Sequence, residues 1–588
     1  MPSEKKIYWA LGILLLASAV VRGLLAGAIE LGNDEVYYWT YACYPDLSHF
    51  DHPPMVGLVI QFFSLNLLLE NEFFLRLASV VLGTLSTFLI FMIGKEIKNS
   101  LTGLYAALLY TASFYGFILC GTFILPDTPQ GFFWLATLYL LIRSLPDEEI
   151  SVRSRNFLFA AGIFAGMALL SKYHSFFLLA GVFMYILRYN SRWFLVKETY
   201  LAFLVALLIF SPVIIWNADH DFISFTFHEN RVDPGSSGIN IQYFLTEVIG
   251  QFFYNNPVNV LIILAAFIAL LRRKNFLELR FRRLLLWISL PLCLVFTGFS
   301  LFRSTLPHWT GPAYYGFILL AAAFLAHDEQ EDKRLRLIPW PVAVSMSLLI
   351  LVISVAVTQI RYGWIPLKKW KVNDVSADLA GWKQLGEKFA PLAKWDEDHY
   401  LMTKGSPILT FRWFPAANLD YYVARKIHKK VFAIGDIERI HKYYWINRTR
   451  GNLRKGSDAW YIALSNDYED PVNLYGKNYE LILPSDTIPI IRGKDTIRTA
   501  YVYRLIGRKD DLIFTPSDTV KKSPAQASTD TLIYLNREIR SDPTLMKILD
   551  KRAKQQGILL DDLIRKEALR IMRRQPPVIL PVNDSAGR

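Results

Sequence analysis

The stretch Gly32-Asn33-Asp34-Glu35-Val36-Tyr37-Tyr38-Trp39 follows the first hydrophobic segment of the chain, and His49-Phe50-Asp51-His52-Pro53-Pro54 comes shortly after it. Carboxylates, imidazoles and aromatic rings are crowded here beside a segment apolar enough to lie in a lipid bilayer. Ionisable groups near a bilayer are costly to place and usually serve a function. The pattern therefore predicts a polar reaction centre at the water–lipid boundary, with aromatic faces for a sugar and carboxylates for acid–base or metal chemistry. The alternative is an aromatic belt at the membrane interface with ordinary solvated carboxylates.

The composition of the whole chain is that of an integral membrane protein. Of its 588 residues, 53% are hydrophobic and 14% aromatic, and the mean hydropathy is +0.26. Apolar runs near the length of a membrane span recur up to about residue 360 and then stop. We expect a polytopic α-helical protein with about eleven spans, or up to thirteen. The expected spans are residues 7–27, 73–94, 101–118, 128–143, 157–170, 174–188, 199–217, 257–271, 284–301, 312–327 and 339–360.

The distribution of basic residues predicts the orientation. Alternate loops carry Lys and Arg, most densely between residues 272 and 283, whereas residues 23–75 contain neither. Because basic loops stay in the cytoplasm, we expect a cytoplasmic N-terminus and extracytoplasmic acidic segments, in the plasma (inner) membrane. Residues 55–69 are apolar but short, and counting them as a span would reverse every later loop. We therefore predict a helix in the outer interface, opened by Pro53-Pro54.

The charge distribution and the cysteine content argue against a nucleic-acid-binding protein and against a fold held by disulfides or a metal cluster. The net charge of +13 lies largely in these short loops, which argues against nucleic acid as a partner. The three cysteines predict neither a disulfide framework nor a metal cluster.

We expect three regions along the chain. Residues 1–360 form a membrane domain with an outer-face loop at 30–72, and residues 361–515 form an extracytoplasmic soluble α/β domain. Within the latter, helical spacing covers 377–392, and the expected strands are 431–434, 460–464 and 479–483. Residues 516–588 are expected to be a polar linker followed by a charged helical tail.

Four segments resemble a known family. They are Asp34-Glu35-Val36-Tyr37-Tyr38, His49–Pro54, Leu125-Pro126-Asp127-Thr128-Pro129 and Leu170-Ser171-Lys172-Tyr173-His174. Their order over roughly the first 360 residues is similar to that in GT-C-fold membrane glycosyltransferases, near the dolichyl-phosphate-mannose protein mannosyltransferases and the lipid A aminoarabinose transferases. The resemblance implies that a polyprenyl-phosphate-linked sugar is transferred, with inversion, to an envelope lipid, glycan or protein acceptor on the extracytoplasmic side.

Inverting transfer needs a group that takes or orients the acceptor proton and groups that stabilise the departing phosphate. The expected catalytic residues are Asp34, Glu35 and Asp127, of which Asp34 and Asp127 match acidic positions of the family. The expected donor phosphate-binding residues are Lys172, Arg303 and His174, of which Lys172 matches a family lysine. The expected sugar- or acceptor-binding residues are Tyr37, Tyr38, His52, His308 and Trp309. Structural alternatives remain: helix capping for Asp34, a plain helix start for Asp127, and snorkelling to the interface for Arg303.

The family resemblance also associates an acid at the position of Asp51 with a bound divalent ion. No metal-ligand spacing accompanies Asp51, and histidines that hydrogen-bond to sugar or phosphate would leave the same sequence pattern. No cofactor beyond such an ion is suggested. Two other classes of protein stay open, a polytopic transporter and an envelope-assembly protein without glycosyl transfer. A transporter usually shows internal repeats, and we find none.

Overall fold

The structure is a computed structural model, and it describes residues 2–146, 149–232, 238–331, 336–370 and 374–514, with a few residues between 546 and 564. The chain divides into two compact units. The first comprises residues 1–434 and 441–514, and the second comprises residues 435–440 and 515–588. In the second unit, the structure describes the helix α18 (Ile437–Ile440) and an ion pair between Lys554 and Asp550 at 2.8 Å. The expected linker and most of the charged tail lie outside the described residues.

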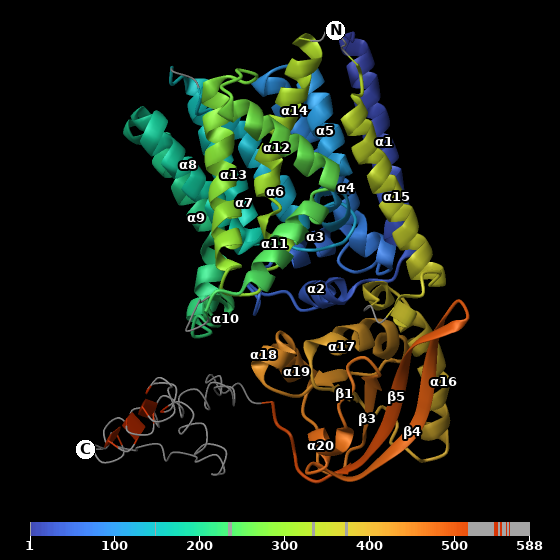
Figure 1. Cartoon of the computed structure of the whole chain (residues 1–588). Coiled ribbons are helices and arrows are strands. Elements are labelled where there is room, and N and C mark those ends of the chain that lie inside the picture. Colours follow the sequence, from blue (N-terminus) through green and yellow to red (C-terminus); the bar gives the residue numbers. More distant parts are fainter. Residues whose placement is uncertain are drawn as a thin grey trace, which may run out of the picture. The chain divides into compact units, whose positions relative to one another are not determined.

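Residues 2–362 of the first unit form a helical bundle, the membrane region (Figure 1). Within the described residues, five helices are long and apolar enough to cross a membrane: α1 (Glu4–Ala28), α4 (Glu72–Ile97), α7 (Val152–Ser171), α9 (Lys197–Ala218) and α15 (Trp340–Tyr362). A sixth candidate is the pair α11 (Ile241–Tyr254) and α12 (Pro257–Leu271), which is bent by 100°. The other long helices are α5 (Ser100–Ala112), α6 (Asp127–Ile142), α8 (Phe176–Tyr189), α13 (Leu279–Phe299) and α14 (Ala313–Glu331).

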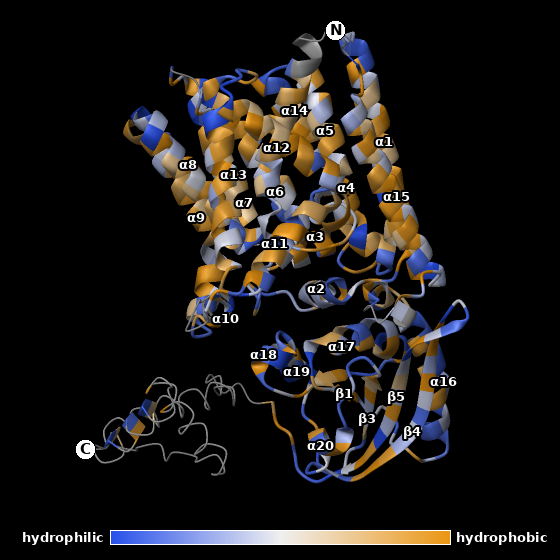
Figure 2. Cartoon of the chain, in the orientation of Figure 1, coloured by the Kyte–Doolittle hydropathy of each residue, from blue (hydrophilic) through white to orange (hydrophobic). Residues whose placement is uncertain are grey.

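Each of the eleven expected apolar ranges coincides with one of these helices, although several are too short or too charged to qualify as spans alone. The chain is therefore an integral membrane protein with several apolar spans, and the exact number of crossings stays a prediction. Figure 2 shows that hydrophobic residues predominate along these helices.

Small residues allow neighbouring helices of the bundle to approach closely. A Cβ atom added at Gly162 of α7 would lie 2.6 Å from the Cα of Ala202 of α9, and one added at Gly94 would lie 2.7 Å from the Cα of Gly103. Close contact of this kind stabilises helix pairs in membranes, where lipid removes most of the hydrophobic driving force.

The acidic stretch differs from the expected loop, because residues Asn33–Cys43 form the helix α2. Gly32 precedes it, and the carboxylate of Glu35 accepts a hydrogen bond from the Gly32 amide at 2.8 Å, as in a capping box. The following helix α3 (Met55–Phe63) begins after Pro53-Pro54 and has nine residues, too few to span a bilayer. The segment 218–256, which the expected spans 199–217 and 257–271 leave as an extracytoplasmic loop, contains α10 (Ile223–Val232) and α11.

Residues 374–514 form what we call the α/β region, in which five strands make one sheet of order β2-β1-β3-β5-β4. The strands are β1 (Ile408–Thr410), β2 (Val431–Ala433), β3 (Ala459–Leu464), β4 (Tyr479–Arg492) and β5 (Asp495–Arg508). The pairs β1–β2 and β1–β3 are parallel, whereas β3–β5 and β4–β5 are antiparallel.

Other helices of the α/β region include α16 (Trp382–Asp398), α17 (Trp413–Asn418) and α19 (Tyr443–Arg450). The helix α16 packs on the sheet: the rings of Phe389 and Trp460 are 5.3 Å apart, and Arg504 forms an ion pair with Asp396 at 2.7 Å. The expected helix and three expected strands thus have counterparts here, while β1 and β5 were not anticipated.

The orientation of the bundle can be tested with single cysteines at exposed positions. In a background where Cys43, Cys120 and Cys293 are replaced by Ser, we expect Asn466→Cys to react with a membrane-impermeant maleimide in intact spheroplasts. Asn275→Cys should react only after permeabilisation, because it lies in one of the basic loops that are predicted to be cytoplasmic. The opposite labelling pattern would refute the predicted orientation.

Candidate active site

Asp34 is the unpaired carboxylate of the site. It lies in the first turn of α2 with its side chain exposed, and no described residue gives it a hydrogen bond or an ion pair. Although water reaches it, surrounding protein still desolvates it, and this burial is the largest influence that raises its pKa. The charges of Asp51, Glu35 and Asp127 raise the pKa further, Arg231 opposes them, and the result is about 6. Asp34 is thus poised to exchange a proton near neutral pH.

Glu35, the next residue, is buried and fully engaged. Its carboxylate forms two hydrogen bonds with the Arg76 guanidinium, at 2.7 and 2.6 Å, and accepts another from the Ile124 amide at 2.9 Å. Arg76 also donates to the carbonyls of Ala26, Ile29 and Glu30. Glu35 therefore joins α2 to α1, α4 and the segment before α6, which favours a positioning role over the expected catalytic one.

Asp127 begins α6 and pairs with Lys172 at the end of α7. The Lys172 ammonium lies 2.9 and 2.8 Å from the two Asp127 oxygens, and the Tyr115 hydroxyl donates to Asp127 at 2.9 Å. Both charged side chains are almost fully buried. An ammonium has three protons, so the pair leaves Lys172 one donor for a further ligand.

Asp51 is held by aromatic hydroxyls from α2. Tyr37 and Tyr41 donate to the same Asp51 oxygen at 2.8 and 2.5 Å. Burial raises the pKa of Asp51, but His52, His441 and these two hydrogen bonds together outweigh burial and leave it below its ordinary value. Asp51 therefore remains ionised close to Asp34.

The histidines near these acids are neutral at physiological pH. Burial lowers the pKa of His52 to about 3 and that of His308 to about 4, and it holds the pKa of His174 well below its ordinary value. His228 of α10 lies with Nε2 2.7 Å from the Asp51 carbonyl oxygen, and its ring is 6.0 Å from that of His52. These imidazoles can hydrogen-bond to a ligand, but they do not supply positive charge at neutral pH.

Two of the remaining expected residues, Trp309 and Tyr38, lie against buried histidines. Trp309 is buried with its ring 5.4 Å from that of His174, and the Arg231 guanidinium lies 5.2 Å from the centre of the Trp309 ring. Tyr38 is buried with its ring 5.7 Å from that of His52. The third, Arg303, is half-buried and interacts with other residues of the protein.

Residues of the α/β region also reach the site. The ring of Trp413 is 4.8 Å from that of Tyr37 and stacks on His441 at 5.5 Å. The Tyr422 hydroxyl accepts a hydrogen bond from the Leu31 amide at 2.6 Å. The helix α2 is therefore packed between the two regions.

The donor set around Asp51 does not fit a metal centre. Among the described residues, no group of three or more His, Cys, Asp or Glu side chains is arranged to hold an ion. One Asp51 oxygen already accepts two hydrogen bonds. A metal role for Asp51 stays a prediction, and the chemical steps proposed for Asp34 do not depend on it.

Sequence reasoning did not single out Arg231, His228 or Trp413. The first two lie in the segment that was expected to be a loop, and Trp413 is far along the chain. The available signal was Arg231 itself, a basic residue in a segment predicted to be extracytoplasmic, where such residues are rare.

We expect Glu35→Gln to destabilise the protein strongly, because it leaves the buried Arg76 guanidinium without a counter-charge. Breaking a buried ion pair from one side costs about 3–5 kcal/mol, and thermal unfolding in detergent would measure the loss. The matched control is Glu278→Gln, which breaks an exposed pair with Arg280 and should have little effect. Equal unfolding temperatures for the two variants would contradict the anchoring role of Glu35.

Comparison with known proteins agrees with this architecture. A family model described as dolichyl-phosphate-mannose-protein mannosyltransferase matches residues 51–216. The chain is 24% identical over 319 residues to the lipid A galacturonosyltransferase RgtD of Rhizobium johnstonii. That alignment covers 53% of this chain and 64% of the relative, so the chain spans less than two thirds of the relative's length.

Two solved structures share the fold at low sequence identity. ArnT from Cupriavidus metallidurans in the apo state is 15% identical with a TM-score of 0.53, covering 83% of this chain and 97% of ArnT. ArnT bound to undecaprenyl phosphate is 16% identical with a TM-score of 0.52, covering 87% and 99%. The chain therefore has the GT-C fold and resembles the membrane glycosyltransferases of the mannosyltransferase and ArnT-like family.

Proposed function

We propose that this protein transfers a sugar, with inversion, from a polyprenyl-phosphate donor to an envelope lipid, glycan or protein acceptor on the extracytoplasmic side. The observation that carries the proposal is the state of Asp34. It is an accessible carboxylate without a partner among the described residues, and desolvation, aided by neighbouring acids, raises its pKa to about 6. A carboxylate kept only for structure would be expected to have donors, as Glu35 and Asp127 do.

In this mechanism Asp34 acts as the base. It takes the proton of an acceptor hydroxyl while that oxygen attacks the anomeric carbon from the face opposite the phosphate. The bond from the anomeric carbon to the phosphate oxygen breaks, and its electron pair leaves with the lipid phosphate. If the acceptor is itself a phosphate, Asp34 has no proton to remove and instead orients the acceptor.

The leaving phosphate needs donors and positive charge. We assign these to Lys172, whose third proton is free of Asp127, and to Arg231, whose charge already acts on Asp34. Arg303 and His174 stay candidate phosphate-binding residues, with neutral His174 acting as a hydrogen-bonding group. Charge-assisted contacts of this kind are the strong ones in phosphate recognition.

The sugar and acceptor are assigned to the surroundings of Asp34. Tyr38, His52, His308 and Trp309 supply rings and neutral imidazoles there, while Tyr37 acts through its hydrogen bond to Asp51. In this proposal, Glu35 and Asp127 position the site through Arg76 and Lys172 and do not take part in proton transfer.

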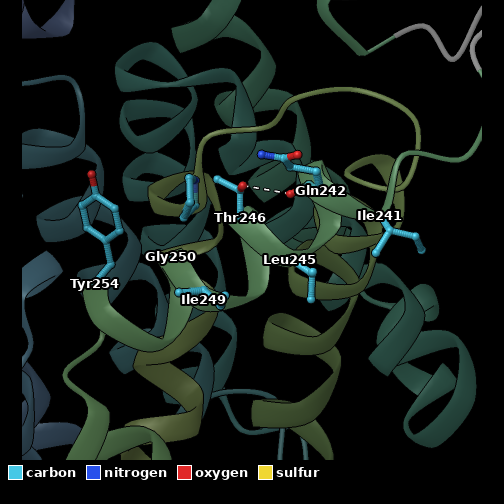
Figure 3. A pocket seen from close by; sticks show the side chains of 8 residues that line it. Ile241, Gln242, Leu245, Thr246, Ile249, Gly250 and Tyr254 are labelled. Carbon is cyan, nitrogen blue, oxygen red and sulfur yellow. Dashed lines mark hydrogen bonds between the residues drawn. The ribbon is translucent and has the colours of Figure 1, made fainter. Parts of the chain in front are cut away.

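A pocket beside the site suits a hydrocarbon chain. Its volume is about 750 Å³, and it is lined by Ile241, Gln242, Leu245, Thr246, Ile249, Gly250, Tyr254 and Pro307. Figure 3 shows the labelled lining residues distributed along α11, from Ile241 to Tyr254. At one end, the Tyr254 ring is 6.0 Å from the ring of His308, which follows Pro307 directly. We assign this pocket to the first isoprene units of the donor.

We expect Asp34→Asn to lower turnover by about 10²–10⁴-fold, the usual contribution of general acid–base catalysis. In the parent, activity should rise with pH through about 6, because only the ionised carboxylate can accept the proton. Purified protein, a polyprenyl-phosphate sugar and envelope acceptor lipids would supply the assay.

A measurement of the stability of Asp34→Asn shows whether its loss of turnover comes from misfolding. Folding raises the pKa of Asp34, so the fold disfavours its ionised form, and the variant should be at least as stable as the parent above pH 6. An Asn variant within a few-fold of parental activity would exclude Asp34 as the base. A transporter or assembly protein would show no transfer by the parent.

Thr246→Phe should narrow the pocket and weaken the use of long-chain donors. Displacing about two methylene groups corresponds to a roughly tenfold rise in KM. A donor with a short chain should be unaffected. Val248→Phe is the matched control, since Val248 is an exposed residue of the same helix that does not line the pocket. Equal effects on both chain lengths would place the donor chain elsewhere.

A further inference from the structure

Lys442 is a buried cation without a carboxylate partner. It belongs to the α/β region, directly before α19, and is only 4% exposed. Its ammonium donates to the Tyr44 carbonyl, lies 2.9 Å from His49 Nδ1 and lies 4.5 Å from the centre of the Tyr41 ring. Among the described residues, no acid forms an ion pair with it. Burying a charge in this way is costly, and burial holds the pKa of Lys442 well below its ordinary value.

All these contacts are made with the segment that surrounds the acidic centre. The backbone amide of Lys442 also donates to the Tyr37 hydroxyl at 3.3 Å. Lys442 therefore touches both tyrosines whose hydroxyls hold Asp51. One residue of the α/β region thus contacts both of the hydroxyl-bearing side chains that hold Asp51.

Two other contacts between the membrane region and the α/β region are ordinary ion pairs. Lys383 forms an ion pair with Glu72 at 2.7 Å, and Arg425 pairs with Glu70 at 2.5 Å. These pairs are partly exposed, each has its own carboxylate, and none touches Tyr37 or Tyr41. They join the two regions away from these tyrosines, whereas the contacts of Lys442 lie against Tyr37 and Tyr41.

We propose that Lys442 is a positioning residue of the active site: it holds Tyr37 and Tyr41 so that both hydroxyls stay on Asp51. This inference rests on the proposed glycosyl transfer and adds a contribution of the α/β region to it. Without the Lys442 side chain, Tyr41 loses a cation–π contact, and the Tyr44 carbonyl and His49 lose a polar partner. The backbone amide of residue 442 and Tyr37 are then held less firmly, so the Asp51 carboxylate can turn relative to Asp34. Small displacements of catalytic groups reduce turnover more than they reduce binding.

The first test compares Lys442→Met with Lys383→Met, which removes an ion pair between the same two regions. We expect Lys442→Met to lower kcat by about tenfold or more with little change in KM for donor or acceptor. Lys383→Met should leave kcat near that of the parent. Equal kcat values in the two lysine variants would overturn the proposal.

A double-mutant cycle distinguishes action through the tyrosines from general loosening. In a Tyr37→Phe, Tyr41→Phe background, Lys442→Met should lower kcat little further, because the hydroxyls that it positions are already absent. Independent, multiplicative effects would refute the inference. If Lys442→Met does not fold, Lys442→Gln serves in the same cycle, since its neutral amide stays polar but is one bond shorter and removes the positive charge over the Tyr41 ring.

A third test, hydrogen exchange, does not depend on an assay of glycosyl transfer. Hydrogen exchange of the backbone amides of residues 37–51 should accelerate in Lys442→Met and not in Lys383→Met, and unchanged exchange would overturn the inference. If the parent catalyses no transfer, the proposed function fails, and the exchange result still decides whether Lys442 positions this segment.

Discussion

The buried ion pair between Glu35 and Arg76 is the constraint on which the site depends. A two-pronged contact of 2.7 and 2.6 Å fixes the first turn of α2 against α4, while Arg76 also holds the last carbonyls around α1. Consecutive residues of a helix point about 100° apart. Because Glu35 is fixed toward α4, Asp34 must point in another direction, where water reaches it. The orientation of Asp34 thus follows from the burial of its neighbour.

The environments of the four clustered acids separate Asp34 from the other three. Glu35 and Asp127 each face a buried cation, and Asp51 accepts hydrogen bonds from two tyrosines. Burial of Asp34 is the largest influence that disfavours its ionisation, and the charges of these three acids add to it. Pairs of titratable groups whose environments separate their pKa values commonly have separate roles in catalysis. In our proposal, Glu35, Asp51 and Asp127 hold the site together and contribute negative charge. Asp34 accepts the proton.

The helices of the membrane region could be predicted because long apolar runs alternate with loops that are basic on one side only, as at the C-terminal end of α4 and the N-terminal end of α9. The helix α2 was taken for a loop, although Gly32 and the acids of its first turn are helix-start signals. Strand β1 has only three residues and gives too little periodicity to detect. For the site, motif position indicated Asp34, Asp127 and Lys172. The pairing of Asp127 with Lys172 joins residues 45 positions apart and depends on helix packing that no local pattern encodes.

The packing of α2 makes the α/β region more than an appendage. Tyr37 and Tyr41 are almost fully buried, and the rings and amides that cover them include Trp413 and Lys442 of the α/β region. Buried polar groups of this kind require their partners, because an unsatisfied donor or acceptor away from water is destabilising. A membrane region alone would therefore expose the tyrosines and release the hydrogen bonds on Asp51. The geometry around Asp34 is consequently a property of both regions folded together, although the sequence motifs shared with known transferases all lie in the membrane region.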